Sequence, residues 1–158
     1  MAGNLEAAML SKDQRDKIVS IIDAAADLTI ATNRADGYPQ ATTVSFVNDG
    51  MAIYFGTWSQ SQKAKNIARD DRVSIAITDP YKTWNDIKGV SIGGRARKLN
   101  DPGELAKVGA IMMKKFPQIA EFAKTMQETE MAMFRIDAEV ISVLDYGKAF
   151  GHTDLVTV

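Results

Sequence analysis

The spacing of apolar residues divides the first third of the chain into one helix and three extended segments. Ile18, Ile21 and Ile22 recur at helical spacing behind a capping box that starts at Ser11, which predicts a helix over residues 12–26. Asp-Gly pairs, which are typical of hairpin turns, separate the segments that follow. These segments are rich in β-branched and aromatic residues and predict an antiparallel meander of strands at residues 28–32, 40–47 and 51–57.

Three more strands are predicted further along the chain, at residues 72–78, 87–99 and 131–144. The first of them alternates strictly between apolar and polar side chains, as a half-buried strand does. In the second, the Gly93-Gly94 pair indicates a bulge or a sharp bend. The tail, residues 145–158, shows no regular pattern and is expected to be irregular.

Further helices are expected to begin near Ser61, at Pro102 behind an Asp101 N-cap, and at Pro117, the last ending near Glu128. The chain lacks the alternation of strands and helices, and the glycine fingerprint, of a doubly wound sheet. An antiparallel barrel fits better because closure removes exposed strand edges. The sequence therefore predicts a mainly β fold with α, a six-stranded antiparallel barrel with peripheral helices, in a single domain over residues 1–158.

Composition and charge exclude several classes of function. The 158 residues carry a formal net charge of −1 without a basic run, which argues against a nucleic-acid-binding protein. The chain has no cysteine and a single histidine, His152, so neither a cysteine-rich nor a histidine-rich metal site is expected. Neither a secretory signal nor a membrane-spanning stretch is evident, so we expect a cytoplasmic protein without a membrane partner.

The junction between the third strand and the helix near Ser61 is the first candidate site. Thr57, Ser59 and Ser61 supply hydroxyl groups there, and Lys63 adds a positive charge. The free N–H groups and the dipole of a helix start favour an anion such as phosphate. The glycine-rich pattern of a P-loop is absent, and a serine-capped surface helix with solvated lysines is the alternative interpretation.

The order of these segments resembles the FMN-binding split barrel of the pyridoxamine 5′-phosphate oxidase-like superfamily. The tail from Asp145 to Asp154 looks like that of the general-stress-protein branch. Spacing and order, not any single residue, carry the resemblance. The matching segments are Asp36-Gly37-Tyr38-Pro39, residues 41–47, residues 53–67, Asp71-Arg72-Val73-Ser74, Lys88-Gly89-Val90 and Gly94-Arg95-Ala96.

The resemblance implies a six-stranded split barrel that binds FMN non-covalently at the interface of a homodimer. It places Thr43, Val44 and Ser45 along the isoalloxazine ring. It assigns the phosphate to the side chains of Thr57, Ser61, Gln62 and Lys63.

Two positions depart from the family pattern. Many members have an arginine where this chain has Gln62, and another at the start of the second strand, where it has Thr42. Losing two cations is expected to weaken phosphate binding, and Arg95 or Arg97 on a neighbouring strand is a candidate to compensate.

Other candidate residues keep two interpretations each. Trp84 and Tyr81 lie in a polar loop and are expected either to cover the flavin ring or to anchor a dimer interface. His152 is either an acid–base group or a tail histidine that caps or packs. Five methionines are assigned to the core or an interface, namely Met112, Met113, Met126, Met131 and Met133.

The expected function is that of an FMN-binding oxidoreductase, in which flavin exchanges hydride with a reduced nicotinamide or a small organic substrate. The alternative is a flavin-binding module for storage or stress response without turnover of its own. A third possibility is another ligand in the same barrel, a deazaflavin or haem. The terminus Asp154-Leu155-Val156-Thr157-Val158 differs from the Arg-Leu-x-Pro type of the vitamin oxidase, so oxidation of pyridoxamine phosphate is not expected.

Overall fold

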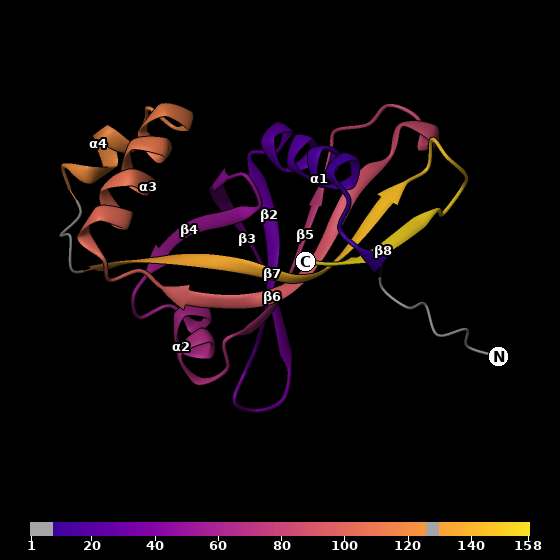
Figure 1. The fold of residues 1–158 in the computed structure, drawn as a ribbon. Coiled ribbons are helices and arrows are strands. Elements are labelled where there is room, and N and C mark those ends of the chain that lie inside the picture. The colour runs from indigo at the N-terminus through magenta and orange to yellow at the C-terminus, as the bar shows by residue number, and fades with distance from the viewer. Residues whose placement is uncertain (1–7, 126–129) are drawn as a thin grey trace.

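The computed structural model describes residues 8–125 and 130–158, and a closed barrel of antiparallel strands forms its centre. The strands follow the order β7-β4-β3-β2-β5-β6, and β6 pairs again with β7 to close the ring (Figure 1). The predicted mainly β fold with a six-stranded antiparallel barrel is therefore confirmed. The strands are β2 Asp27–Asn33, β3 Pro39–Asp49, β4 Ala52–Trp58, β5 Arg72–Thr78, β6 Lys88–Lys98 and β7 Met131–Asp145.

Two short strands extend the sheet beyond the barrel. β8, Thr153–Thr157, pairs antiparallel with the end of β7, and β1, Ala8–Met9, pairs parallel with β8. The prediction of an irregular tail was therefore wrong. The segment is short and follows a turn, so its own sequence gives a weak signal, and it becomes a strand because β7 offers an edge to pair with.

The helices lie around the barrel. Figure 1 shows α1 and α2 on opposite sides of it, with α3 and α4 together at one end. α1 begins behind Ser11, whose capping box is formed as predicted. The end of the last predicted helix, near Glu128, falls outside the described residues. The helices are α1 Lys12–Ala24, α2 Gln62–Arg69, α3 Pro102–Lys115 and α4 Ile119–Ala123, with a 3-10 turn, η1, at Trp84–Asp86.

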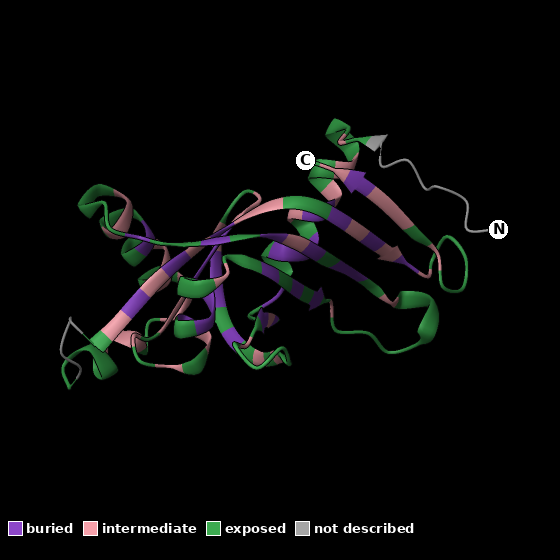
Figure 2. Cartoon of the chain, turned by 90° about the horizontal axis from the view of Figure 1, so that it is seen from below, coloured by how far each residue is buried: buried purple, intermediate pink, exposed green. Residues whose placement is uncertain are grey.

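The core fills the barrel because alternate residues of each strand point inward. β5 shows this most clearly, since Val73, Ile75 and Ile77 are buried while the residues between them are exposed. Phe55 on β4 and Phe134 on β7 stack with their ring centroids 5.3 Å apart. In Figure 2 the buried positions follow the strands through the middle of the molecule.

α3 packs on the outer side of the barrel through a second, smaller core. Val47, Tyr54, Leu99 and Val108 are buried together there. The start of the helix is held electrostatically, because Glu104 lies 3.0 Å from Arg97 and 3.2 Å from Arg135. These two ion pairs join α3 to β6 and β7, and packing against Tyr54 joins it to β4.

The end of α3 is tied to the α1–β2 junction by Lys115. Its Nζ donates a hydrogen bond of 2.7 Å to the carbonyl oxygen of Ala25 and lies 4.2 Å from the centroid of the Phe46 ring. Burial lowers the pKa of Lys115, because desolvation disfavours its charged form. Helix α3 is therefore fixed to the barrel at both ends.

The predicted irregularity at Gly93-Gly94 is present in the pairing of β6 with β7. Gly93 pairs with Val140 and Gly94 with Ala138, so Glu139 is the extra residue and the bulge lies on β7. A Cβ at Gly94 would lie 2.2 Å from the carbonyl oxygen of Asp137. Only glycine allows the two backbones to approach this closely.

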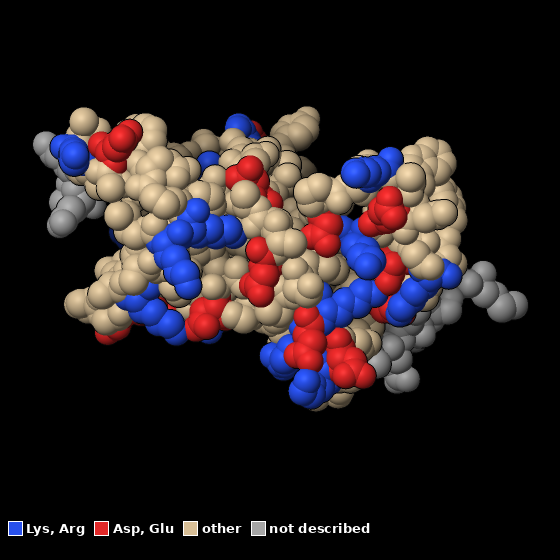
Figure 3. Space-filling model, turned by 90° about the horizontal axis from the view of Figure 1, so that it is seen from above, with Lys and Arg blue, Asp and Glu red and all other residues tan. Residues whose placement is uncertain are grey.

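Charges of both signs are mixed on the face that Figure 3 draws. On the face drawn in Figure 3, acidic and basic side chains are interspersed and no area of a single sign dominates. Among the described helices, none has the length and apolar character needed to cross a membrane. The described residues also contain no group of three or more His, Cys, Asp or Glu side chains arranged to hold a metal ion.

We predict that Gly94→Ala lowers the free energy of unfolding by about 1–3 kcal/mol, because its Cβ collides with backbone. Gly109→Ala is the matched control, since nothing lies within 4 Å of a Cβ at that position in α3. It should raise the free energy of unfolding by about 0.5–1 kcal/mol. Urea unfolding of both variants measures this, and equal stabilities would contradict the close approach of β6 to β7.

Candidate functional site

The candidate phosphate site lies where β4 ends and α2 begins. Ser61 is the N-cap of α2, and its Oγ accepts a hydrogen bond of 3.2 Å from the backbone N–H of Ala64. Thr57 on β4 donates its hydroxyl to the same oxygen at 3.2 Å. The backbone N–H groups of Gln62 and Lys63 have no partner within the helix, as at any helix start. The predicted strand, turn and helix start are therefore present at these residues.

Lys63 is the free cation of this junction. Its side chain is half-buried, and among residues 8–125 and 130–158 it takes part in no ion pair or hydrogen bond. Arg95, by contrast, lies 2.6 Å from Asp71 and 2.9 Å from Glu139. Arg97 is held by Glu104, so both arginines that were expected to compensate are neutralised by carboxylates. Their positions do not support that expectation.

A cavity of about 730 Å³ opens beside this junction. A volume of this size suits a small-molecule ligand. The strands contribute polar groups and Lys63 adds its charge, whereas the helices α3 and α4 contribute mainly apolar side chains. The cavity is lined by Thr43, Val44, Ser45, Gly56, Thr57, Lys63, Met112, Phe116, Gln118, Ile119, Phe122, Ala123, Met131 and Met133.

The residues expected along the ring and at the phosphate meet in this one cavity. Thr43, Val44 and Ser45 come from β3, Thr57 comes from the end of β4, and Lys63 comes from α2. Ser61 does not line the cavity, but its hydroxyl is bonded to Thr57, which does. The order of the segments in the sequence was sufficient to bring these residues together.

The side chains of Gln62 and Thr42 do not line the cavity. The side-chain amide of Gln62 donates to Asn66 Oδ1 at 2.8 Å, and the buried Asn66 donates in turn to Thr32 Oγ1 at 3.0 Å. This polar network fixes α2 to the barrel. Thr42 lies on the opposite face of β3 from Thr43, and its buried Oγ1 has no hydrogen-bond partner among the described residues.

Trp84 lies outside the cavity of its own chain. It belongs to η1, and its ring centroid is 5.7 Å from that of Phe150. Both side chains are largely exposed, with 67% of Trp84 and 74% of Phe150 accessible. Contact between Trp84 and a ligand in this cavity would have to come from another copy of the chain, so its role stays a prediction.

His152 also lies away from the cavity. It is in the turn between β7 and β8, where its Nε2 is 3.0 Å from Oδ1 of Asp154. Lys148 donates a hydrogen bond of 2.8 Å to the same carboxylate, and this bond together with the neighbouring imidazole lowers the pKa of Asp154. The position of His152 favours packing and pairing in the turn over acid–base chemistry in the cavity.

The side of the cavity that α3 and α4 form was not predicted from the sequence. Met112, Phe116 and Ile119 follow one another at helical spacing, which is the signal of a buried helix face. Met112 and Met133 do pack against the second core, as expected, but both also line the cavity. Periodicity shows that a face is covered and does not show whether protein or ligand covers it.

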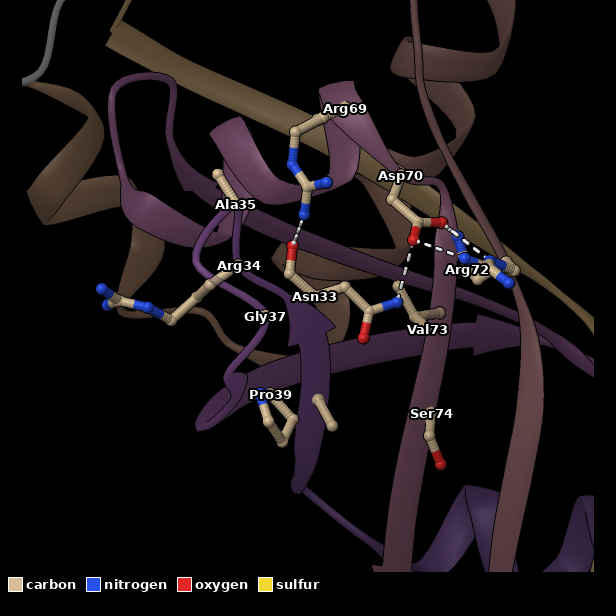
Figure 4. A pocket seen from close by; sticks show the side chains of 11 residues that line it. Asn33, Arg34, Ala35, Gly37, Pro39, Arg69, Asp70, Arg72, Val73 and Ser74 are labelled. Carbon is tan, nitrogen blue, oxygen red and sulfur yellow. Dashed lines mark hydrogen bonds and ion pairs between the residues drawn. The ribbon is translucent and has the colours of Figure 1, made fainter.

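A second, more open cavity of about 700 Å³ lies at the β2–β3 turn and contains none of the predicted site residues. Figure 4 shows Arg72 held by Asp70 and Arg69 held by the backbone of Asn33. The third arginine of this cavity, Arg34, lies 2.7 Å from Asp36. Hydrogen bonds from Arg72 lower the pKa of the Asp70 carboxyl group. Because these cations already have partners, the cavity beside Lys63 is the stronger candidate.

The chain is similar in sequence and fold to known proteins. General stress protein 26 of Bacillus subtilis (strain 168) is 28% identical over 97 residues, which cover 61% of this chain and 67% of that protein. A conserved hypothetical protein from Mycobacterium tuberculosis is 28% identical with a TM-score of 0.73, over 90% of this chain and 89% of that one.

A heme binding protein from Mycobacterium smegmatis shares the fold, with a TM-score of 0.75 at 20% identity. The match covers 96% of this chain and 60% of that protein. The family model for pyridoxamine 5′-phosphate oxidase matches residues 15–145, which is most of the sequence. The chain therefore belongs to the pyridoxamine 5′-phosphate oxidase family.

Proposed function

We propose that this protein binds FMN in the cavity beside α2 and acts as a flavin-dependent oxidoreductase on a small molecule. The observation that carries the proposal is Lys63 at the start of α2, which is unpaired among the described residues and is the one charged side chain in the described lining of the cavity. A half-buried cation without a counter-charge favours an anionic ligand, and the apolar wall beside it favours an attached ring system.

The groups at the α2 junction fit a phosphate. Lys63 provides a full charge, the first N–H groups of α2 provide donors, and the helix dipole has its positive end there. The hydroxyls of Thr57 and Ser61 are already within hydrogen-bond reach of one another, so the two groups are held together before a ligand arrives. Hydrogen bonds between a cation and a phosphate are of the stronger, charge-assisted class.

The groups on β3 and β4 fit a flat ring. Thr43 and Ser45 point to the outer face of β3 and offer small side chains and backbone groups. Gly56 on the neighbouring strand lacks a side chain, and a Cβ there would lie 2.9 Å from Sδ of Met133. Gly56 therefore lets Met133 approach β4 closely at this edge of the cavity.

The chemistry would come from the cofactor. Bound flavin supplies the exchange of hydride and electrons, and the chain's own side chains bind it, orient it and exclude water. Lys63 is the one ionisable side chain among the described residues that line the cavity. Its role is to hold the phosphate, and no described lining residue is equipped to move a proton.

A flavin-binding protein without turnover is the second candidate. The observation that favours it is that no described lining residue besides Lys63 is an acid or a base, because binding and storage need neither.

Haem is a third candidate ligand, since a heme binding protein shares the fold. The one histidine of the chain lies in the β7–β8 turn, so within one chain the available soft ligands for an iron are Met112, Met131 and Met133.

We also propose that the protein is a homodimer. The outer face of the barrel carries two rows of small, uncharged residues that are paired across β3, β2, β5, β6 and β7. The lack of charge along both rows fits the core of a contact between subunits, which is depleted of charged residues. The two rows are Thr43, Thr29, Ala76, Ser91 and Ser142, and Ala41, Ala31, Ser74, Gly93 and Val140.

We predict that Lys63→Ala weakens FMN binding by about 1–3 kcal/mol, because a charge-assisted contact to the phosphate is lost. Lys65→Ala is the matched control, since it removes the same charge from an exposed position of α2. Fluorescence titration of FMN into the three proteins measures the affinities. Unchanged affinity in Lys63→Ala would show that the phosphate binds elsewhere.

The rate of flavin reduction distinguishes a flavin-dependent oxidoreductase from a flavin-storage protein. Under anaerobic conditions we expect a reduced nicotinamide to bleach the FMN of the loaded protein faster than it reduces free FMN, because the protein holds the ring in place. The measurement is a stopped-flow absorbance trace with free FMN as the control. Reduction of loaded protein no faster than that of free FMN with every reductant tested would favour the storage role.

Light scattering tests the dimer. Wild-type protein at micromolar concentration should have twice the mass of the chain, and Ala76→Arg in the middle of the small-residue face should give monomers by burying an unpaired charge. Ser20→Arg introduces the same side chain on the exposed side of α1 and should leave the mass unchanged. A wild-type monomer would contradict the proposal.

A further inference from the structure

One wall of the cavity remains without a role once the strands and α2 are assigned to FMN. It is formed by α3, the turn after it, α4 and the start of β7, and we call it the helical wall. Its side chains are Met112, Phe116, Gln118, Ile119, Phe122, Ala123, Met131 and Met133. Gln118 is the polar member of this set, and every other side chain is apolar.

The helical wall is built into the fold before any ligand arrives. Met112, Phe116 and Met133 pack against the second core, so their positions are set by buried neighbours. Contacts at both ends of α3 add to this, with Glu104 held by Arg135 at one end and Lys115 bonded to Ala25 at the other. A wall fixed in this way can select a ligand by shape.

Two groups on the wall are free to contact a ligand. Phe122 lines the cavity and has 63% of its surface exposed, so its ring is accessible to a ligand. Gln118 is the N-cap of α4, but its side chain makes no capping hydrogen bond. The wall thus combines an uncovered ring with an amide that can donate or accept a hydrogen bond.

No charged side chain is among the described residues that form this wall. The charged side chains on the same two helices, including Lys114 and Glu121, do not line the cavity. Lys115 is directed to the backbone of Ala25 and the ring of Phe46. With Lys63 occupied by the phosphate, a charged group would find no counter-ion among the described residues of this wall, so an uncharged group is favoured over a charged one.

We infer that the helical wall binds the second substrate of the enzyme, and that this substrate is an uncharged, planar aromatic molecule. Its ring would pack on Phe122 and Phe116, and a carbonyl or amide on it would bond to Gln118. The inference rests on the proposed function in one respect, since FMN is taken to occupy the polar end of the cavity with Lys63. A second copy of this chain covering Phe122 is the competing occupant.

Equilibrium dialysis with two probes of the same shape tests this. Naphthamide is neutral, and naphthoate carries one negative charge at neutral pH, so the pair shares its ring system and shape and differs in charge and in the N–H donors of the amide. We expect FMN-loaded protein to bind naphthamide at least about tenfold more tightly than naphthoate, because the charge finds no partner on the wall. Equal binding, or tighter binding of naphthoate, would overturn the inference.

Two variants locate the bound probe. Phe122→Ala should weaken naphthamide binding about threefold to tenfold by removing an aromatic contact, and its exposure means that folding is not at risk. Met113→Ala is the matched control, because it removes an exposed apolar side chain of α3 that does not line the cavity. Unchanged naphthamide binding in Phe122→Ala overturns the inference, and a change confined to the dimer mass points to the second copy instead.

The outcome can be separated from that of the FMN proposal. Naphthamide binding is measured on FMN-free protein as well, where the helical wall is present without the cofactor. If Lys63→Ala leaves FMN affinity unchanged but Phe122→Ala still weakens naphthamide binding, the phosphate site is wrong and the wall assignment stands. If FMN binding follows Lys63 but naphthamide does not bind, the wall assignment fails alone.

Discussion

The pairing of β7 with both β4 and β6 is the constraint on which the rest of the structure depends. It closes the barrel, and it sets Met133 opposite Gly56 and Ala132 opposite Thr57 at the end where α2 begins. The helices α3 and α4 lie in the connection between β6 and β7, so the same closure carries them to that end. The cavity is thus a consequence of how the barrel shuts.

The distribution of paired and unpaired charge then gives the cavity its character. Most arginines described here, including Arg95 and Arg97, are bound to carboxylates on neighbouring elements and serve to hold the fold. Lys63 stands apart because it is half-buried, on the edge of the cavity and without a carboxylate partner among the described residues. One free cation and an apolar wall together suit a ligand that has an anionic group at one end and a ring at the other.

Much of the fold could be predicted because its signals are local. The strict alternation of residues 72–78 and the capping serines Ser11 and Ser61 depend on neighbours in the sequence, and each is found as expected. The site residues on β3, β4 and α2 came together because the order of segments in a barrel fixes which strands are adjacent. β8 was missed because its pairing depends on the edge of β7, which no local pattern reveals.

The lining of the helical wall and the contacts of Trp84 could not be predicted from the sequence of one chain. Met112 was assigned to the core or an interface. The structure was needed to show that Met112 and Phe116 also border a cavity. Trp84 was expected either to cover the ring or to anchor a dimer interface, and within one chain it packs near Phe150, away from the cavity. The contacts of an exposed loop depend on assembly, which the sequence of one chain does not specify.

The visible absorption spectrum of the purified protein tests the central claim most directly. If the cavity holds FMN, the protein should show the two bands of an oxidised flavin, as isolated or after incubation with FMN and gel filtration, and denaturation should release free FMN. A Soret band would contradict the account by identifying the ligand as haem. A spectrum without flavin bands after incubation with excess FMN would contradict it as well.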